Sequence, residues 1–326
     1  MIHKIINLTV EQDENDRLDK FIVSKIPEIT RSKIQSMIKD SCVFINGSII
    51  TTGSYKTKEG DNLEIRIPPP EPLNLVPEKM DLDIVYEDEY LAVLNKPPGL
   101  VIHPGAGNHN STLVHGLLAH FQENLSSINE LRPGIVHRLD KNTSGLLMIA
   151  KNDNIHAKLS EQLQERTIKR TYFAVVWGNV PNSEATIETN IARNHRDRKK
   201  MAVTKYGGKV AITHYKLLKS FLNGAFSLIE CKLETGRTHQ IRVHFTHLGY
   251  PIVGDPEYCN VRKKRKHKLP EEVTEHINSL NRQMLHAKKL SFIHPVTEKA
   301  LDFEIELHKD VLDLISVLEK YENNQK

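Results

Sequence analysis

Residues 134–152 contain the polar groups that could do chemistry. The loop from Arg138 to Ser144 places basic, amide and hydroxyl side chains beside a single carboxylate, Asp140, which could act as an anionic nucleophile or base. An apolar pair precedes this loop, and the apolar run 146–150 that follows it predicts a buried strand. Spacing alone is equally compatible with a surface turn of solvated charges, so the rest of the chain has to decide.

A tyrosine lies in a second apolar segment. Residues 169–178 are rich in β-branched and aromatic side chains, which predicts a strand. Strand alternation then places Tyr172 on one face with small apolar neighbours. A tyrosine in such a position is usually part of the core, with its hydroxyl bonded to a partner.

Residues 239–245 also predict a strand, with Gln240, Arg242 and His244 on one face and apolar side chains on the other. An arginine that projects from such a strand is a good candidate to meet a carboxylate. Because alternation sends His239 and His244 to opposite faces, these histidines could not share a metal ion without distortion. We therefore predict no metal site. Residues 103–108 lack the Gly-Lys-Ser/Thr of a phosphate-binding loop, so we predict a plain glycine loop there.

The composition limits the class of protein. The chain has 326 residues, enough for about two domains, and its 39% apolar content suffices for a core. Three cysteines, far apart and odd in number, argue against a disulfide framework and fit a reducing compartment. The first residues contain no apolar signal core, and no apolar run reaches membrane-spanning length. We expect a soluble cytoplasmic protein.

The N-terminal part of the chain predicts one compact module. Apolar residues at helical spacing predict a helix over 17–26 and a second helix that begins at Thr30. Asn-Gly at residues 46–47, between two apolar runs, predicts a hairpin, and a last strand is expected over 63–67. Basic side chains such as Arg31 remain for the outer helix face.

A Pro-rich segment separates this module from the rest of the chain. Residues 68–72 read Pro-Pro-Pro-Glu-Pro, which is typical of a semi-rigid linker. We expect a module over 1–67, a linker over 68–78 and a second domain over 79–326. In that domain we predict helices over 113–121 and from Asp153. We also predict a strand pair over 84–86 and 90–94, and strands over 228–233 and 301–307 before a last helix.

Positive charge is concentrated in a few places, although the formal net charge is only +4. Residues 192–209 carry seven basic side chains and one acid, and two adjacent glycines suggest a flexible loop there. A second basic run spans 262–268. Either run alone could be a solvated patch, but two of them beside a basic N-terminal module favour a polyanionic partner.

Long motifs connect these features. They are His137-Arg-Leu-Asp-Lys-Asn-Thr-Ser-Gly-Leu-Leu, Lys169-Arg-Thr-Tyr and Leu233-Glu-Thr-Gly-Arg-Thr-His-Gln-Ile-Arg-Val-His. In this order they resemble the RluA family of pseudouridine synthases, and Asn95-Lys-Pro-Pro-Gly-Leu and Val253-Gly-Asp-Pro agree. The N-terminal segments, among them Arg17-Leu-Asp-Lys-Phe and Thr30-Arg-Ser-Lys-Ile-Gln, resemble an S4 RNA-binding domain.

The resemblance implies an α+β protein, in which an S4-like module is linked to a catalytic domain built on a mixed, mostly antiparallel sheet with flanking helices. It implies an isomerase that breaks the C1′–N1 bond of a uridine in RNA and rejoins the uracil through C5, with no cofactor. Asp140 would be the catalytic carboxylate and Arg242 its ion-pair partner, while Tyr172 would stack on the uracil and help to move the C5 proton. The residues expected to contact RNA are Arg138, which would fill the space of the extruded base, and Arg17, Arg31, Lys33, Lys199 and Lys200.

The expected partner is large-subunit ribosomal RNA or a pre-ribosomal particle, with the protein acting as a monomer. Transfer-RNA specificities share the same motifs, so the target stays open at this point. Glycoside hydrolysis would break the same type of bond, but it usually needs two carboxylates, and the Asp140 loop contains one. The other alternative is a non-catalytic RNA-binding factor for ribosome assembly, which loss of Asp140, Tyr172 or Arg242 would favour; all three are present.

Overall fold

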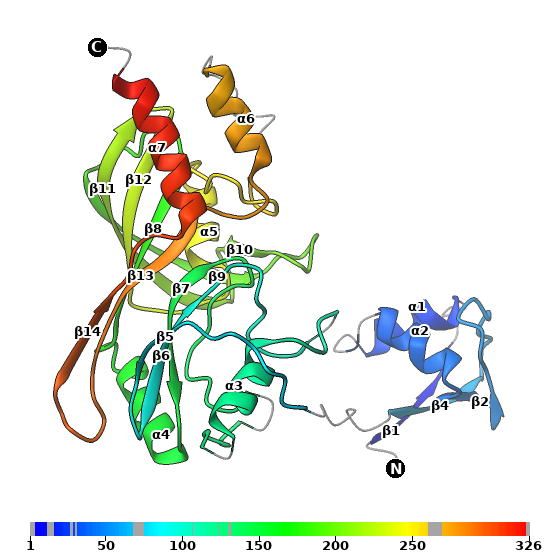
Figure 1. Ribbon diagram of the computed structural model, residues 1–326. Coiled ribbons are helices and arrows are strands. Elements are labelled where there is room, and N and C mark those ends of the chain that lie inside the picture. The colour runs from blue at the N-terminus through cyan, green and yellow to red at the C-terminus, as the bar shows by residue number, and fades with distance from the viewer. Residues whose placement is uncertain are drawn as a thin grey trace. The chain divides into compact units, whose positions relative to one another are not determined.

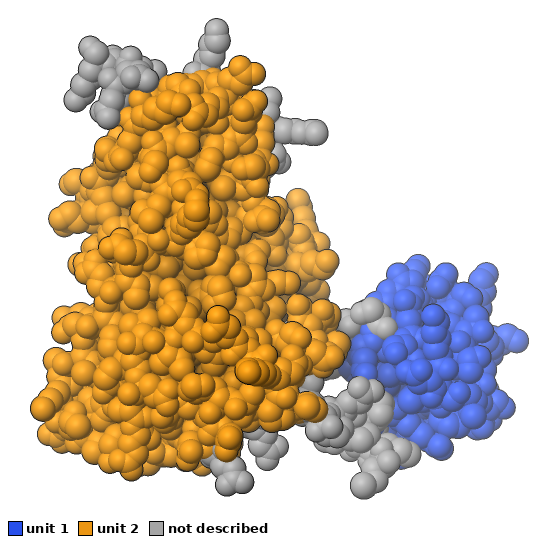
Figure 2. All heavy atoms as spheres, in the orientation of Figure 1, with its two compact units in different colours: residues 1–72 blue, residues 73–326 orange. Residues whose placement is uncertain are grey.

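The structure is a computed structural model of the 326-residue chain. It describes residues 4–11, 16–26, 29, 31–67, 75–105, 107–122, 124–129, 132–259 and 269–323. The chain divides into two compact units, residues 1–72 (unit 1) and 73–326 (unit 2), which Figure 2 distinguishes by colour. Thr30, most of the expected linker and the basic run 262–268 lie outside the described residues.

Unit 1 is a small sheet with two helices. Its strands have the order β1-β4-β2-β3, and its elements are β1 (Lys4–Thr9), α1 (Leu18–Lys25), α2 (Arg31–Lys39), β2 (Val43–Ile45), β3 (Ser48–Ile49) and β4 (Asn62–Ile67). The predicted hairpin is confirmed: Asn46 and Gly47 turn between β2 and β3 with φ values of +49° and +79°. Strand β1, which the sequence analysis did not predict, pairs antiparallel with β4.

Unit 2 contains a ten-stranded sheet in the order β10-β9-β11-β12-β8-β13-β7-β6-β5, with β14 paired to β13 (Figure 1). Only β13 and β7 pair in parallel, so the mixed, mostly antiparallel α+β fold is confirmed in the described residues. The strands are β5 (Ile84–Glu87), β6 (Leu91–Lys96), β7 (Ser144–Ala150), β8 (Lys169–Trp177), β9 (Glu184–Arg193), β10 (Met201–Thr204), β11 (Lys209–Phe221), β12 (Phe226–Leu233), β13 (Leu285–Ile293) and β14 (Ala300–Glu304). The helices are α3 (Leu113–Phe121), α4 (Asp153–Gln164), α5 (Gln240–His247), α6 (Glu271–Ser279) and α7 (Lys309–Asn323).

Two strands of unit 2 are buried on both faces. In β6, Leu91 and Val93 pack in one cluster with residues of α4, whereas Ala92 and Leu94 pack in another with residues of α3. Strand β7 is buried along its whole length, which confirms the strand predicted from its apolar run. Because β7 is fixed on both faces, the loop that precedes it starts from a rigid support.

One predicted element is wrong. Residues 240–247 form helix α5, although the sequence analysis predicted a strand over 239–245. Gln240 to Phe245 are all buried, so no polar face shows the helical period, and the alternation of Ile241, Val243 and Phe245 resembled a strand. Ile241 and Phe245, four residues apart, both enter the main core, as one helix face requires.

Smaller differences concern helix and strand ends. Asn152, and not Asp153, caps α4 by accepting the N–H of Ile155, while Asp153 accepts the N–H groups of Ser127 and Ile128. The two-glycine segment lies between β10 and β11, which both pair with β9, and Gly207 and Gly208 both have positive φ. None of the helices in the described ranges combines the length and apolar character that a membrane-spanning segment needs.

Candidate active site

Unit 2 contains a cavity of about 540 Å³ between the loop before β7, the end of α4, the start of β8 and the start of α5. This volume lies in the usual range of small-molecule pockets, about 300–1,000 Å³. Arg138, Asp140, Tyr172 and Arg242 all line the cavity. The structure therefore brings together the three side chains that the sequence analysis proposed as catalytic, together with Arg138.

The loop that carries Asp140 is held by backbone contacts on both sides. The buried ammonium of Lys96, at the end of β6, donates to the carbonyl of Lys141 at 2.9 Å and to the carbonyls of two residues in the 97–100 loop. Arg282 donates to the carbonyl of Asn142 at 3.0 Å, and Gln283 donates to the Thr143 hydroxyl at 3.0 Å. Because these partners come from β6 and from the segment before β13, the two strands that flank β7 fix the position of Asp140.

Gly145 is required where this loop enters β7. Its φ is +113°, and a Cβ there would collide with the backbone of Ala287, its partner in the parallel β7–β13 pair. Only glycine allows this close approach at such a dihedral. The close contact of Gly145 with Ala287 therefore fixes the end of the Asp140 loop against β13.

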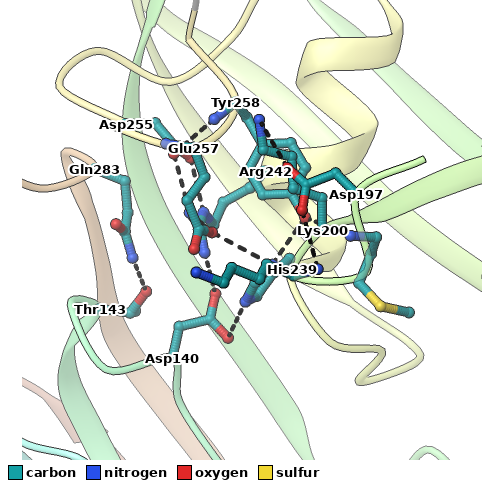
Figure 3. A network of polar contacts seen from close by, with 12 residues as sticks. Asp140, Thr143, Asp197, Lys200, His239, Arg242, Asp255, Glu257, Tyr258 and Gln283 are labelled. Carbon is teal, nitrogen blue, oxygen red and sulfur yellow. Dashed lines mark hydrogen bonds and ion pairs between the residues drawn. The ribbon is translucent and has the colours of Figure 1, made fainter. Parts of the chain in front are cut away.

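Arg242 binds three carboxylates (Figure 3). Its Nε and Nη2 atoms donate to Asp255 at 2.7 and 2.9 Å, in the bidentate geometry that suits a guanidinium. Nη2 also donates to Glu257 at 2.7 Å, and Nη1 donates to Asp140 Oδ2 at 3.2 Å. Burial alone would lower the pKa of Arg242, but its bonds with these three carboxylates raise that pKa.

This arrangement decides what the Asp140–Arg242 pair can do. Asp255 is fully buried and holds the guanidinium in place, whereas Asp140 is 17% exposed toward the cavity. Asp140 therefore meets an arginine whose orientation is already fixed by another carboxylate. Asp140 thus accepts a hydrogen bond from a fixed donor and stays accessible to a molecule in the cavity.

Tyr172 contributes its ring to the cavity wall from β8 and is nearly buried. Burial raises its pKa, because a phenolate would be poorly solvated there. The phenol therefore keeps its proton near neutral pH. In this state it can stack on a flat ring and can donate a hydrogen bond.

The sequence analysis missed several side chains of this region. Asp255 is the aspartate of the Val253-Gly-Asp-Pro motif, which was noted without a role, and Glu257 and Tyr258 come directly after that motif. His239 also lines the cavity, with Nε2 3.9 Å from Asp140 Oδ1. A helix between residues 240 and 247 would have been needed to predict that His239 and Arg242 both line the cavity. In the described residues, no group of three or more His, Cys, Asp or Glu side chains is arranged to hold a metal ion.

His137 has a supporting position beside the cavity. Its Nε2 accepts the backbone N–H of Met148 at 3.1 Å, which holds the ring against β7. Burial lowers its pKa to about 3, so the ring is neutral at physiological pH.

The expected RNA-contact residues are in two places. In unit 1, Arg17 and Arg31 both bind the buried Asp19 and are still half-exposed, and Lys33 lies on α2. In unit 2, Lys199 and Lys200 lie in the turn between β9 and β10, where Asp197 is 3.7 Å from the Lys200 ammonium. The charges of Arg17 and Arg31 are therefore partly neutralised by Asp19, which the sequence analysis did not anticipate.

Comparisons with known proteins agree with this architecture. Residues 90–247, which include Asp140, Tyr172 and Arg242, match the family model of RNA pseudouridylate synthase, and residues 16–63 match the S4 domain model. The uncharacterized RNA pseudouridine synthase YlyB of Bacillus subtilis is 44% identical over 95% of this chain and 96% of its own length. The chain belongs to the RNA pseudouridine synthase family. Members of this family are isomerases, so the chain is an enzyme of that class.

Two further comparisons bear on the family. A protein of Neisseria meningitidis named ribosomal large subunit pseudouridine synthase D is 47% identical over 96% of this chain and 82% of that protein. The solved structure of human RNA pseudouridylate synthase domain containing 1 is 26% identical and covers 73% of this chain and 95% of its own, with a TM-score of 0.54. The fold of the synthase domain is therefore shared with a protein of much lower sequence identity.

Proposed function

We propose that this synthase isomerises uridines of large-subunit ribosomal RNA to pseudouridine, with Asp140 as the catalytic carboxylate. The observation that carries the proposal is the pairing of a partly exposed Asp140 with a buried, fixed Arg242 in the wall of the cavity. The choice of RNA is supported by the name of the Neisseria relative, which spans nearly the whole of this chain.

The reaction rearranges bonds within one nucleotide. The C1′–N1 bond breaks, the uracil turns, and a C1′–C5 bond forms, while C5 loses a proton and N1 gains one. Asp140 would either attack C1′ or remove a proton from the sugar, and both roles need an ionised carboxylate. Arg242 would fix the direction of the Asp140 carboxylate, since Asp255 holds the guanidinium.

Two other side chains of the cavity would act on the base. Tyr172 would stack against the uracil, and its hydroxyl would help to move the C5 proton by accepting it on oxygen while releasing its own hydrogen to solvent. Arg138 would occupy the space that the extruded nucleotide leaves in the RNA. Extrusion costs a few kcal/mol of stacking and pairing, which these contacts would have to offset.

RNA would be held mainly through its phosphates. Unit 1, which matches the S4 model, and the basic β9–β10 turn would supply Lys and Arg contacts that position the RNA without reading its sequence. In this proposal residues 1–67 bind RNA, residues 68–78 act as a linker and residues 79–326 carry out the reaction. We keep the expectation that the enzyme acts as a cytoplasmic monomer, in the compartment that holds ribosomal RNA.

The test is to delete the gene and to map pseudouridines by carbodiimide-dependent stops of reverse transcriptase. We expect specific stops to vanish from large-subunit ribosomal RNA and to return when the wild-type gene is restored, but not when an Asp140→Asn copy is restored. Loss of stops from transfer RNA alone would contradict the proposed substrate. If no stop vanished and only ribosome assembly were affected, the non-catalytic alternative would be favoured.

A further inference from the structure

His239 has a left-handed backbone conformation, which few non-glycine residues adopt. It caps the N-terminus of α5 with φ +56° and ψ +22°, in the left-handed region that favours glycine. Its side chain is only 16% exposed and lines the cavity. A non-glycine residue held in this region carries backbone strain, and such residues are concentrated at functional sites. The strained backbone therefore makes the imidazole of His239 a candidate functional group.

The ring of His239 is oriented by Tyr258. Nδ1 lies 2.8 Å from the Tyr258 hydroxyl, and the two rings meet edge to face. The same hydroxyl oxygen accepts the backbone N–H of Met201 at 2.7 Å, and the Arg242 guanidinium lies over the Tyr258 ring. In the tautomer that leaves Nδ1 as an acceptor, the Tyr258 hydroxyl, which accepts from Met201, donates its own hydrogen to Nδ1. The ring hydrogen of a neutral His239 is then on Nε2.

Nε2 faces the carboxylate on which the proposed chemistry depends. It lies 3.9 Å from Asp140 Oδ1, while Arg242 Nη1 lies 3.2 Å from Oδ2 (Figure 3). His239 is the residue before α5 and Arg242 lies in the first turn of that helix, and both line the cavity. Glu257 lies 3.7 Å from Nδ1, yet burial lowers the pKa of His239 and favours the neutral ring. The distance of 3.9 Å is long for a hydrogen bond, and such contacts often shorten when substrate binds.

We propose that His239 is a positioning residue, whose Nε2–H, aligned by Tyr258, holds the Oδ1 oxygen of Asp140 while Arg242 holds Oδ2. The torsion that turns a carboxylate has broad, shallow wells, so a single partner leaves it free to swing. Two donors on its two oxygens fix the plane of the group and the direction of the lone pair that meets the sugar. This inference rests on the proposed function, because it assigns the act of catalysis to Asp140.

Two substitutions at His239 distinguish a role as hydrogen-bond donor through Nε2 from a purely structural role. His239→Asn keeps a residue that tolerates the left-handed region and keeps a polar atom near the position of Nδ1, but it has no group at the position of Nε2. His239→Gln carries an amide N–H at about the reach of Nε2. The matched control is His247→Asn, the same change at an exposed position in the last turn of α5.

The experiment measures tritium release from RNA containing [5-³H]uridine in single turnover, with RNA affinity measured on the same full-length preparations. We expect His239→Asn to slow release about 10–100-fold at nearly unchanged RNA affinity, because small misplacements of a reacting group are that costly. We expect His239→Gln to recover most of the rate and His247→Asn to match the wild type. Tyr258→Phe, which leaves the α5 backbone unchanged, should slow release by several-fold through loss of ring alignment.

Several results would overturn the inference. A wild-type rate in His239→Asn would mean that Nε2 is idle, and equal slow rates in the Asn and Gln variants would mean a purely structural role. A wild-type rate in Tyr258→Phe would remove the alignment step. If His239→Asn is fast while Asp140→Asn is inactive, the inference fails and the proposed function stands; if Asp140→Asn is also fast, both fail.

Discussion

Arg242 binds the carboxylates of Asp140, Asp255 and Glu257. Of these three, Asp255 is the one whose replacement by asparagine should lower the free energy of unfolding of unit 2 the most. The fully buried Asp255 accepts two hydrogen bonds from Arg242 and also the backbone N–H groups of Glu257 and Tyr258 at 2.9 and 3.1 Å. Asparagine would keep the shape but would turn N–H groups toward the guanidinium. Breaking one side of a buried ion pair costs about 3–5 kcal/mol. Because Asp140 and Glu257 remain beside Arg242, we expect the lower end, about 3 kcal/mol.

The assay follows thermal unfolding by the fluorescence of Trp177, the single tryptophan of the chain. Because Trp177 lies in β8, its fluorescence reports on unit 2. At about 2–4 °C per kcal/mol for a domain of this size, Asp255→Asn should lower the melting temperature by about 6–12 °C. The matched control is Glu257→Gln, whose side chain is 40% exposed, so its pair with Arg242 is worth at most about 1 kcal/mol. If both variants melted within about 2 °C of the wild type, Asp255 would not be the group that fixes Arg242.

Two further predictions concern Tyr172 and Asp19. Tyr172→Phe should keep RNA affinity and lose most of the turnover, because the ring still stacks and only the hydroxyl is removed; full activity in tritium release would show that stacking alone suffices. Burial would raise the pKa of Asp19, but hydrogen bonds from Arg17, Arg31 and Gln35 outweigh this effect and hold that pKa well below its usual range. The ionised Asp19 therefore stabilises unit 1 above about pH 4, and this stabilisation is lost as the pH falls further. Asp19→Asn should lower the free energy of unfolding of unit 1 by about 1–3 kcal/mol at pH 6. The variant should also lose this dependence of stability on acid pH. Urea unfolding of residues 1–72, followed by circular dichroism at pH 6 and pH 3, checks both parts, and equal acid sensitivity in the variant would contradict them.

The parts of the fold with strong local signals were predictable from the sequence. The apolar run of β7, the Asn-Gly hairpin of unit 1 and helix α3 follow from patterns that a single segment carries. The motif around Asp140 also identified the loop that lines the cavity. Each of these signals depends on near neighbours in the chain, so no tertiary information was needed.

The rest could not be predicted because it depends on packing. The first six residues of α5 are all buried, so the 3.6-residue period has no exposed polar face to mark it there, and the alternating apolar residues indicated a strand. The error in α5 also hid His239, which lines the cavity together with Arg242. Asp255 is separated from Arg242 by 13 positions, and its role appears only when the chain returns to the start of α5.

The claim that Asp140 is the catalytic carboxylate is tested most directly by tritium release from [5-³H]uridine RNA with the Asp140→Asn variant in single turnover. Arg242 keeps Asp255 and Glu257 as partners, so the loss of stability should stay below the about 3 kcal/mol expected for Asp255→Asn, and Trp177 fluorescence should show a folded unit 2. RNA affinity should be equal or slightly higher, because a negative charge is removed near the phosphates. We expect the rate to fall by at least about 100-fold, the scale that a lost acid–base group produces. Release at a near wild-type rate from this folded, RNA-binding variant would contradict the account.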